Sequence, residues 1–401
     1  MSPAAPVVTR VLIQNFKSIK ACDVSLGPLS ILVGPNGSGK SNFLDALRFT
    51  SDALSTTLDL ALRDRGGINE VRRRSGGHPN HFAVRLDLHL RSGALGHYAF
   101  KVGAAAGGGF RVTDESCTVQ PVELDAHEAS FRIRNGELTT TLDERLPAVA
   151  GDRLFLVSAS NVAAFRPVFD ALTTMGFYNL SPAAIRQAQV PDAGTLLRRD
   201  GSNLASVLGH METSNRPALD RVVEYLRQVA PGVEGVTKRS IGTMETIEFR
   251  QRVAGRKEPW AFGAASMSDG TLRGLGVLTA LLQSNGRPPS LIGVEEPEVA
   301  LHPAALSVLI DAIRDAAQHT QVIVTSHSPE LLDREQLGDD ALIAVVADQG
   351  VTAIGPLSSL GRDAVRDGLF TPGELLRINQ LEPHEEARIT SKAEQLVLFD
   401  P

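Results

Sequence analysis

Apolar residues at every second position predict much of the β structure of this chain. One such run occupies five positions: Phe82, Val84, Leu86, Leu88 and Leu90. A period of two is typical of a strand with one buried face. The pattern returns at Tyr98–Val102, and Phe131–Ile133 leads into Asn135-Gly136, a dipeptide typical of tight hairpins. We therefore predict an antiparallel β-rich lobe over residues 62–157, in which residues 154–157 return to the main sheet.

Helical spacing replaces this alternation in the next part of the chain. Ser181-Pro182 has the form of a helix N-cap followed by proline at the first helical position. Apolar residues then recur at helical spacing from Leu219 to Val229, before the stop signal Pro231-Gly232. These features predict a helical lobe over residues 158–245.

A glycine-rich segment joins a short apolar run, Ile31–Val33, to an amphipathic helix pattern. The segment fits the phosphate-loop pattern G-x-x-x-x-G-K-[ST] at every defined position. Its glycines let consecutive backbone amides turn toward a phosphate. Lys40 can then reach the β- and γ-phosphates of a nucleotide, and the Ser41 hydroxyl can bind Mg²⁺. The predicted nucleotide-binding residues are Gly34, Pro35, Asn36, Gly37, Ser38, Gly39, Lys40, Ser41 and Asn42.

Two buried strands later in the chain end in side chains suited to nucleotide hydrolysis. Leu291–Val294 is followed by Glu295-Glu296-Pro297-Glu298, and Gln321–Thr325 by Ser326-His327-Ser328. In an open α/β sheet, ligands bind beyond the carboxyl ends of the strands. One glutamate is expected to help hold the Mg²⁺ hydration shell, and the next to orient and deprotonate the attacking water. His327 is expected to contact the γ-phosphate.

A third motif, Met267–Arg273, reads MSDGTLR and precedes a helix pattern with leucines on one side. On its own it predicts only a capped helix start. Its position shortly before the acidic strand favours an additional, functional interpretation.

Composition narrows the class of protein without naming its activity. The 401 residues are 42% hydrophobic and 21% charged, which is ordinary for a soluble globular protein of two or three folding units. A net charge of −6 argues against a uniformly basic surface, although a local basic patch stays compatible with it. Cys22 and Cys117 lack the spacing of a disulfide framework or zinc site. Without an apolar leader or a membrane-length apolar stretch, we expect a cytoplasmic protein with no membrane association.

Taken in order, these motifs resemble the ATP-binding-cassette ATPases, and more closely the SMC/RecF-like and OLD-like branch of AAA/ABC-type P-loop ATPases. The phosphate loop, the lobes, SDGTLR, VEEPEVALHP and TSHSP follow the family's order, and NFKSIK near the start is similar to the branch's first strand. The resemblance implies an α/β fold with an ABC-type core, a mixed sheet flanked by helices, carrying an inserted antiparallel β lobe and a helical lobe. The core is expected over residues 1–61 and 246–378, with a charged tail at 379–401.

The resemblance also implies roles for individual residues. Ser268, with Gly270, would complete the ATP site of a second subunit, so that a homodimer forms through the ATP site. Glu295 would take the magnesium-associated role, Glu296 that of catalytic base, and His327 that of the switch histidine. The implied cofactors are ATP and Mg²⁺. Transport ATPases usually carry aspartate where this chain has Glu295, whereas EEPE is usual in the OLD-like branch.

The family's Q-loop glutamine has no assigned counterpart here, and Gln14, Gln187 and Gln189 stay open as candidates. No long heptad pattern predicts a coiled-coil arm.

The functional hypothesis is an ATP-hydrolysing, nucleotide-gated dimer in DNA maintenance or anti-phage defence. One alternative is the nucleotide-binding subunit of a transporter, which the large lobes between Leu47 and Ser266 disfavour. Another is an ATPase that regulates a separate nuclease or toxin effector. Intrinsic cleavage would need a carboxylate-rich metal domain after His327, and Asp339-Asp340 does not supply one. We therefore expect a stand-alone ATPase without a Toprim nuclease domain.

Two further segments suggest partners. Arg72-Arg73-Arg74 is a candidate DNA contact, with Arg198 and Arg199 as weaker candidates and a solvated loop as the alternative. The apolar end of the tail, Gln395–Phe399, is expected to dock on the protein's own core. Alternatively, QLVLF resembles the short peptide with which bacterial DNA-processing proteins bind the sliding clamp.

Overall fold

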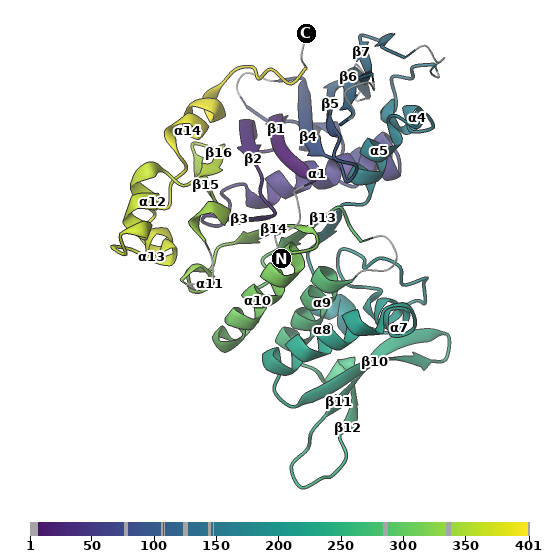
Figure 1. Cartoon of the computed structure of the whole chain (residues 1–401), viewed down its shortest axis with the longest axis vertical. Helices are drawn as coiled ribbons and strands as arrows, with labels where there is room; N and C mark the ends of the chain where they lie inside the picture. The colour runs from purple at the N-terminus through teal and green to yellow at the C-terminus, as the bar shows by residue number, and fades with distance from the viewer. Residues whose placement is uncertain are drawn as a thin grey trace. The chain divides into compact units, whose positions relative to one another are not determined.

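The chain divides into two units in its computed structural model (Figure 1). Of the residues that the structure describes, one unit holds 176–338 and 371–377, and the other holds those up to Met175, 339–370 and those from Ile378 on. The described residues are 7–75, 79–105, 107, 109–122, 127–142, 146, 148–283, 288–333 and 338–399.

The unit that contains the phosphate loop is built on a large antiparallel sheet, with the strand order β2-β1-β4-β5-β6-β7-β8. Its strands are β1 (Val8–Phe16), β2 (Ile19–Ser25), β4 (His81–His89), β5 (Leu95–Ala104), β6 (Phe110–Gln120), β7 (Ala129–Arg134) and β8 (Glu137–Thr140). The strand predicted from alternation is β4, and Asn135-Gly136 forms the predicted hairpin, with φ angles of 52° and 90°. β1 pairs directly with β4, so this sheet joins strands from the predicted core segment 1–61 with strands from the predicted β-rich lobe 62–157.

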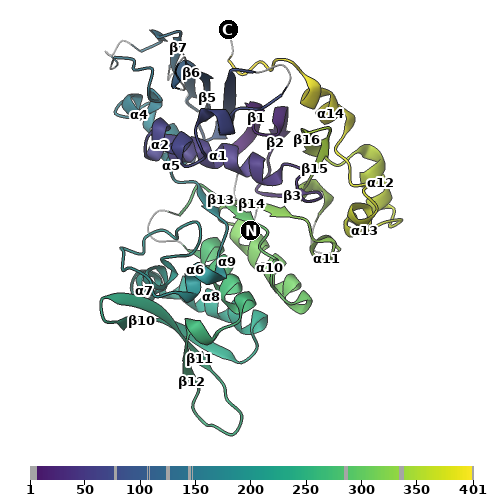
Figure 2. The ribbon, with the colours of Figure 1, turned by 180° about the vertical axis from the view of Figure 1, so that it is seen from behind.

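A helix and a smaller set of strands complete this unit. β3 (Leu29–Val33) leads into α1 (Lys40–Ser55), and β15 (Leu342–Asp348) lies parallel to β3 and antiparallel to β16 (Val351–Pro356). Phe49 of α1 contacts Phe82 and Phe16 of the large sheet, with ring centroids 5.2 and 6.1 Å apart. These buried aromatic contacts fix α1 against the sheet, so the phosphate loop at its start has a rigid support. Figure 2 shows α1 with α2 (Leu58–Arg63) and α5 (Arg166–Thr173).

The remaining helices of this unit are short. They are α3 (Ile68–Val71), α4 (Leu156–Ala159), α12 (Ser359–Arg366) and α14 (Glu385–Lys392), with the 3₁₀ turn η4 (Asp339–Ala341).

The return of residues 154–157 to the main sheet was predicted wrongly. This segment enters α4 instead, because the buried carboxylate of Glu115 accepts hydrogen bonds from the amides of Phe155 and Leu156, at 2.6 and 2.8 Å. Those amides open the first turn of the helix and lack partners within it. Glu115 lies forty positions earlier on β6, so local patterning could not reveal the contact.

The C-terminal tail docks on the large sheet, which confirms the prediction that its apolar end packs against the protein itself. Leu398 is 3% exposed and packs against Leu12 and Ala83, with Leu396 and Phe399 beside them. The side chain of Gln14 donates to the carbonyl of Glu394 at 2.8 Å. This contact accounts structurally for one of the three glutamines left open as Q-loop candidates.

The other unit carries three parallel strands in the order β14-β13-β9. They are β9 (Gly176–Tyr178), β13 (Leu291–Glu295) and β14 (Gln321–Ser326). Their helices are α6 (Pro182–Arg186), α7 (Leu204–Ser214), α8 (Arg216–Val229), α9 (Asp269–Leu282), α10 (Leu306–Ala317), α11 (Pro329–Leu332) and α13 (Pro372–Arg377), with 3₁₀ turns η2 (Ala264–Ser266) and η3 (Pro303–Ala305). A separate antiparallel sheet contains β10 (Val233–Ile241), β11 (Met244–Gln251) and β12 (Trp260–Gly263).

The helix signals read from the sequence are confirmed in this unit. Ser181 caps α6 by accepting a hydrogen bond from the amide of Ala184, and α8 ends before Pro231-Gly232. Within this unit, α8 and α6 of the predicted helical lobe pack against α9. Among the described residues, no helix has the length and apolar character needed to cross a membrane.

Candidate functional site

The phosphate loop has the close-packed backbone that its glycines predict. Gly37 and Gly39 adopt φ angles of 76° and 110°, a region that disfavours side chains with a Cβ atom. A Cβ atom at Gly34 would lie 2.0 Å from the carbonyl oxygen of Val345, and one at Gly39 would lie 2.4 Å from Oγ1 of Thr352. The loop therefore requires glycine both for its conformation and for its approach to β15 and β16.

Lys40 lies inside this loop rather than in solvent. Its side chain is 5% exposed, and its ammonium donates to the carbonyls of Gly34 and Pro35 at 2.8 and 3.0 Å. The hydroxyl of Ser38 is also buried and has no hydrogen-bond partner among the described residues. A buried cation and an unpartnered hydroxyl, set among glycines, form a cradle whose chemistry suits a phosphate.

The start of α1 adds to this cradle. Gly39 is the N-cap residue, Lys40 is the first helical residue, and Ser41 is exposed. The first amides of a helix lack intrahelical acceptors, and its N-terminus carries partial positive charge. The predicted roles of Lys40 and Ser41 therefore fit the local structure.

A hydrogen-bond chain behind the loop joins residues that no sequence pattern connects. Oγ1 of Thr352 donates to the carbonyl of Ser38 at 3.0 Å and lies 2.7 Å from Oγ of Ser18. Nδ2 of Asn42, predicted to bind nucleotide, donates to the same Ser18 oxygen at 2.7 Å. Asn42 thus supports the loop in this structure. Ser18 lay within the recognised NFKSIK segment, but no pattern linked it to Thr352, more than three hundred positions away.

The acidic and histidine motifs of the other unit meet at one edge, as predicted. β13 and β14 are parallel neighbours, with Glu295 opposite Thr325. The amide of Glu296 donates to the carbonyl of Thr325 at 3.0 Å, and Nδ1 of His327 lies 3.1 Å from Oε1 of Glu296. The two atoms are close but do not form a hydrogen bond. Glu296 adopts a φ angle of 45°, a strained backbone of the kind concentrated at functional sites.

Glu298, the last glutamate of the acidic motif, stabilises the loop that carries His327. Glu298 is 7% exposed, and its Oε1 accepts a hydrogen bond of 2.5 Å from Ser326. The same Ser326 oxygen accepts from the amide of Ser328 at 3.1 Å, so the bonds span His327 on both sides. Burial raises the pKa of the Glu298 carboxyl, and the hydrogen bond from Ser326 opposes this rise.

Arg273, the last residue of SDGTLR, connects the signature helix to the acidic motif. It is 8% exposed and donates to the carbonyl of Leu180 at 2.6 Å. Its other nitrogen donates to the carbonyls of Glu295 and Glu296, at 3.2 and 2.9 Å. A residue noted only as part of a motif therefore fixes the backbone that carries both glutamates.

Ser268 caps α9 as predicted. Its side-chain oxygen accepts from the amide of Thr271 at 3.2 Å, and the residue is exposed. Gly270 has a packing reason of its own, since a Cβ atom there would lie 2.4 Å from the carbonyl oxygen of Ala300. The signature-like segment thus lies directly against the loop that follows the acidic motif.

The arginine residues proposed as DNA contacts are engaged elsewhere. Arg73 is 7% exposed and donates to the carbonyls of Ser18 and Gly350, at 2.7 and 2.9 Å, so its guanidinium is structural. Arg74 pairs with Glu70, and Arg72 donates to the carbonyl of Pro79 at 2.7 Å. Burial therefore excludes Arg73 as a surface contact, whereas the side chain of Arg74 is 67% exposed and stays a candidate.

The secondary candidates, Arg198 and Arg199, form ion pairs with different partners. Arg198 lies 3.1 Å from the carboxylate of Asp192, whereas Arg199 lies 2.7 Å from that of Glu295.

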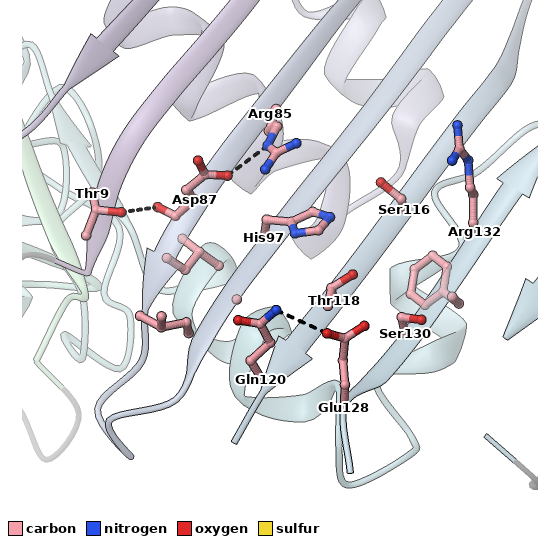
Figure 3. Close-up of a pocket in the computed structure, with 14 residues that line it drawn as sticks. Thr9, Arg85, Asp87, His97, Ser116, Thr118, Gln120, Glu128, Ser130 and Arg132 are labelled. Carbon is pink, nitrogen blue, oxygen red and sulfur yellow. Dashed lines mark hydrogen bonds and ion pairs between the residues drawn. The ribbon is translucent and has the colours of Figure 1, made fainter. Parts of the chain in front are cut away.

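A separate pocket of about 550 Å³ lies over strands β4 to β7 of the large sheet (Figure 3). Its polar groups bond one another: Arg85 donates to Asp87 at 2.8 Å, Thr9 to the carbonyl of Asp87 at 3.1 Å, and Gln120 to Glu128 at 3.1 Å. Charges of both signs line it, so it has no clear preference for an anion or a cation.

Two family descriptions match separate parts of the chain. The family described as "AAA ATPase domain" matches residues 7–77, which include the phosphate loop. An AAA domain family whose description also mentions the AbiEii toxin and a type IV TA system matches residues 176–333, which include the signature-like, acidic and histidine motifs.

Curated relatives and a solved structure agree with these matches. RecF, a DNA replication and repair protein of Vibrio vulnificus, is 51% identical over 41 residues, covering 10% of this chain and 11% of the relative. Structural maintenance of chromosomes protein 4 of Caenorhabditis elegans is 22% identical over 257 residues, 61% of this chain and 16% of the relative. The chain thus spans only a small part of these relatives.

The fold is similar to that of an SmcHead crystallised with the C-winged helix domain of ScpA. The TM-score is 0.54 over 89% of this chain and 99% of the other, at 15% identity. The family matches, the motifs and the relatives support a P-loop ATPase of the SMC/RecF-like branch, and the fold agrees with it.

Proposed function

We propose that the chain binds ATP and hydrolyses it in a magnesium-dependent reaction. The observation that carries this proposal is the cradle at the start of α1, where Lys40 is buried among glycines on the carbonyls of Gly34 and Pro35. A lysine held in this way is ready to exchange its carbonyl partners for phosphate oxygens.

Each residue has a role that follows from its chemistry. The backbone N–H groups of the loop after Pro35, up to Asn42, and the ammonium of Lys40 bind the phosphates. Ser41 and Glu295 supply the oxygen ligands that Mg²⁺ prefers, and the metal, when bound, neutralises charge that develops on the phosphates. Glu296 accepts a proton from the attacking water. His327, held 3.1 Å from the Glu296 carboxylate, contacts the γ-phosphate.

Phosphate release by purified protein tests this function. Wild-type protein should release phosphate from ATP in the presence of Mg²⁺, and Lys40→Ala should release none above background, because the positive charge that stabilises the transferred phosphate is lost. Circular dichroism should be unchanged in Lys40→Ala, since the side chain serves the ligand. Turnover at the wild-type rate in a folded Lys40→Ala protein would remove the phosphate loop from the mechanism.

ATP also acts as a clamp in this proposal, by joining two copies of the chain through the ATP site. Ser268 and Gly270 of one copy approach the nucleotide of the other. The exposure of Ser268 at the N-terminus of the 14-residue helix α9 supports this role, because a helix N-terminus favours an anion.

DNA is the proposed partner of the clamped dimer. The support is the similarity to RecF, whose name places that relative in DNA replication and repair. DNA should bind most tightly with ATP and Mg²⁺ in the Glu296→Gln protein, weaken steeply as salt rises, and lose its ATP dependence in Lys40→Ala. Equal DNA affinity with and without ATP would favour the second candidate, regulation of a toxin or nuclease effector, which the toxin in one family description supports.

The tail is a proposed contact for a sliding clamp. Leu398 packs on Leu12 and Ala83, so the segment Gln395–Phe399 must leave the large sheet to bind a partner. A synthetic peptide of the tail, titrated against purified clamp, tests this idea. Binding that is lost on Leu398→Ala supports it, and no binding at high micromolar concentration excludes it.

A further inference from the structure

Arg199 places a positive charge beside the carboxylate of Glu295, which we assign to magnesium binding. Its Nη2 lies 2.7 Å from Oε1 of Glu295, whose side chain is 16% exposed at the end of β13. Arg199 does not belong to any motif recognised in the sequence. Its guanidinium marks the Glu295 oxygen as a place where a cation is stabilised.

The backbone on both sides of Arg199 is firmly held. Its own carbonyl accepts from the amide of Asn179 at 2.9 Å, and the carbonyl of Asp200 accepts from the amide of Ser181 at 3.0 Å. The amide of Arg198 donates to the side chain of Asn203, which is 1% exposed. These bonds attach the loop to the C-terminal end of β9 and the N-terminal end of α7, so the backbone of Arg199 is fixed in place.

The side chain of Arg199 has more freedom than its backbone. Its side chain is 46% exposed, and the ion pair with Glu295 joins it to the acidic motif. A half-exposed ion pair contributes little free energy, typically below about 1 kcal/mol. The arginine can therefore hold Glu295 while no metal is bound and still give way to a more strongly bound cation.

We propose that Arg199 is a resident counter-cation of Glu295 and competes with Mg²⁺ for this carboxylate when the metal arrives with ATP. This inference rests on the proposed function and adds a control on metal loading. The guanidinium takes one lone-pair direction of Oε1 of Glu295 and places positive charge beside the carboxylate, so a divalent cation that approaches this group meets a like charge. Arg199 therefore lowers the apparent affinity for Mg²⁺ and keeps the adjacent Glu295 and Glu296 from attracting divalent cations before the nucleotide is present.

The adjacent arginine provides a matched control. Arg198 also forms an ion pair with a carboxylate, at 3.1 Å, and is 54% exposed, but its partner is Asp192. The test measures binding of a fluorescent ATP analogue while Mg²⁺ is titrated, with a parallel measurement in EDTA. The proteins compared are wild type and the variants Arg199→Ala, Arg199→Gln, Arg199→Lys and Arg198→Ala.

The half-saturating Mg²⁺ concentration should fall by up to about fivefold in Arg199→Ala and Arg199→Gln, which is the factor that corresponds to an ion pair of about 1 kcal/mol. Arg199→Lys keeps the charge and should stay within about twofold of wild type, as should Arg198→Ala. Affinity in EDTA should be unchanged in every variant.

Two results would overturn the proposal. An unchanged Mg²⁺ dependence in both neutral Arg199 variants would show that the ion pair does not compete with the metal. Weaker binding of the analogue in EDTA would show that Arg199 contacts phosphate instead. Wild-type protein that binds no analogue at any Mg²⁺ concentration would contradict the proposed function itself, so the two failures are distinguishable.

Discussion

The buried carboxylate of Asp45 should be a main electrostatic support of the phosphate-loop helix. Asp45 lies on α1 and is 8% exposed. Lys17 and Arg48 each approach its oxygens to 2.6 Å, and Arg65, whose side chain is 3% exposed, approaches to 2.9 Å. Replacing Asp45 by Asn would keep the shape of the side chain while leaving the buried Arg65 without its main counter-charge.

The size of the effect follows from the pKa of Asp45. Burial alone would raise this pKa, but the positive charges of Arg65, Arg48 and Lys17 lower it from 3.8 to about 2. Since one pKa unit corresponds to about 1.4 kcal/mol, the ionised carboxylate stabilises the fold by roughly 2.5 kcal/mol at neutral pH. Because the folded-state pKa is depressed, this stabilisation is complete above pH 3.8 and is lost as the pH falls through about 2.

Urea unfolding followed by circular dichroism at several pH values measures this contribution. Asp45→Asn should lower the free energy of unfolding by about 2–3 kcal/mol at pH 7, and the difference should shrink below pH 3.8. The control is Asp59→Asn, because Asp59 pairs with Arg63 on the surface, where an ion pair contributes about 0–1 kcal/mol. A loss below about 0.5 kcal/mol for Asp45→Asn at pH 7, or a loss independent of pH, would refute the reasoning.

Further variants test local contacts. Burial raises the pKa of Glu115 from 4.5 to about 7, so the free energy of unfolding of the wild type should fall as the pH rises from 4.5 through about 7. Urea titrations of Glu115→Gln should not show this fall. Thr352→Val should weaken nucleotide binding several-fold in a fluorescence titration, because the Ser38 carbonyl loses its bond while the fold is kept. Gly270→Ala should lower the melting temperature, because the new Cβ meets the Ala300 carbonyl. Ser268→Arg should abolish ATP-dependent dimers in light scattering, whereas Ser268→Thr, which keeps the cap, should not.

Contiguous motifs and strand ends were predictable because the chain itself brings their residues together. Lys40 follows its glycines directly, so the residue types already determine a loop of this kind. Glu295 and His327 could be placed because each ends a buried apolar run, and parallel strands present their carboxyl ends at one edge.

Contacts between distant residues could not be predicted from such patterns. Tertiary packing creates the hydrogen bonds that link Thr352 to Ser18 and Ser18 to Asn42. It also creates the ion pair between Arg199 and Glu295. Arg73 shows the same limit. Its place in a run of arginines predicted a surface contact, yet its guanidinium is buried and donates to two distant backbone carbonyls.

The mass of the Glu296→Gln protein under saturating ATP and Mg²⁺ tests the proposal that ATP gates a dimer of this protein. Loss of the base should block the water-activating step but leave nucleotide binding intact, so ATP-bound protein accumulates. Size-exclusion chromatography with light scattering should then give twice the mass of one chain, and the double variant Lys40→Ala, Glu296→Gln should stay at the single-chain mass. A Glu296→Gln protein that binds ATP yet keeps the single-chain mass would contradict the account.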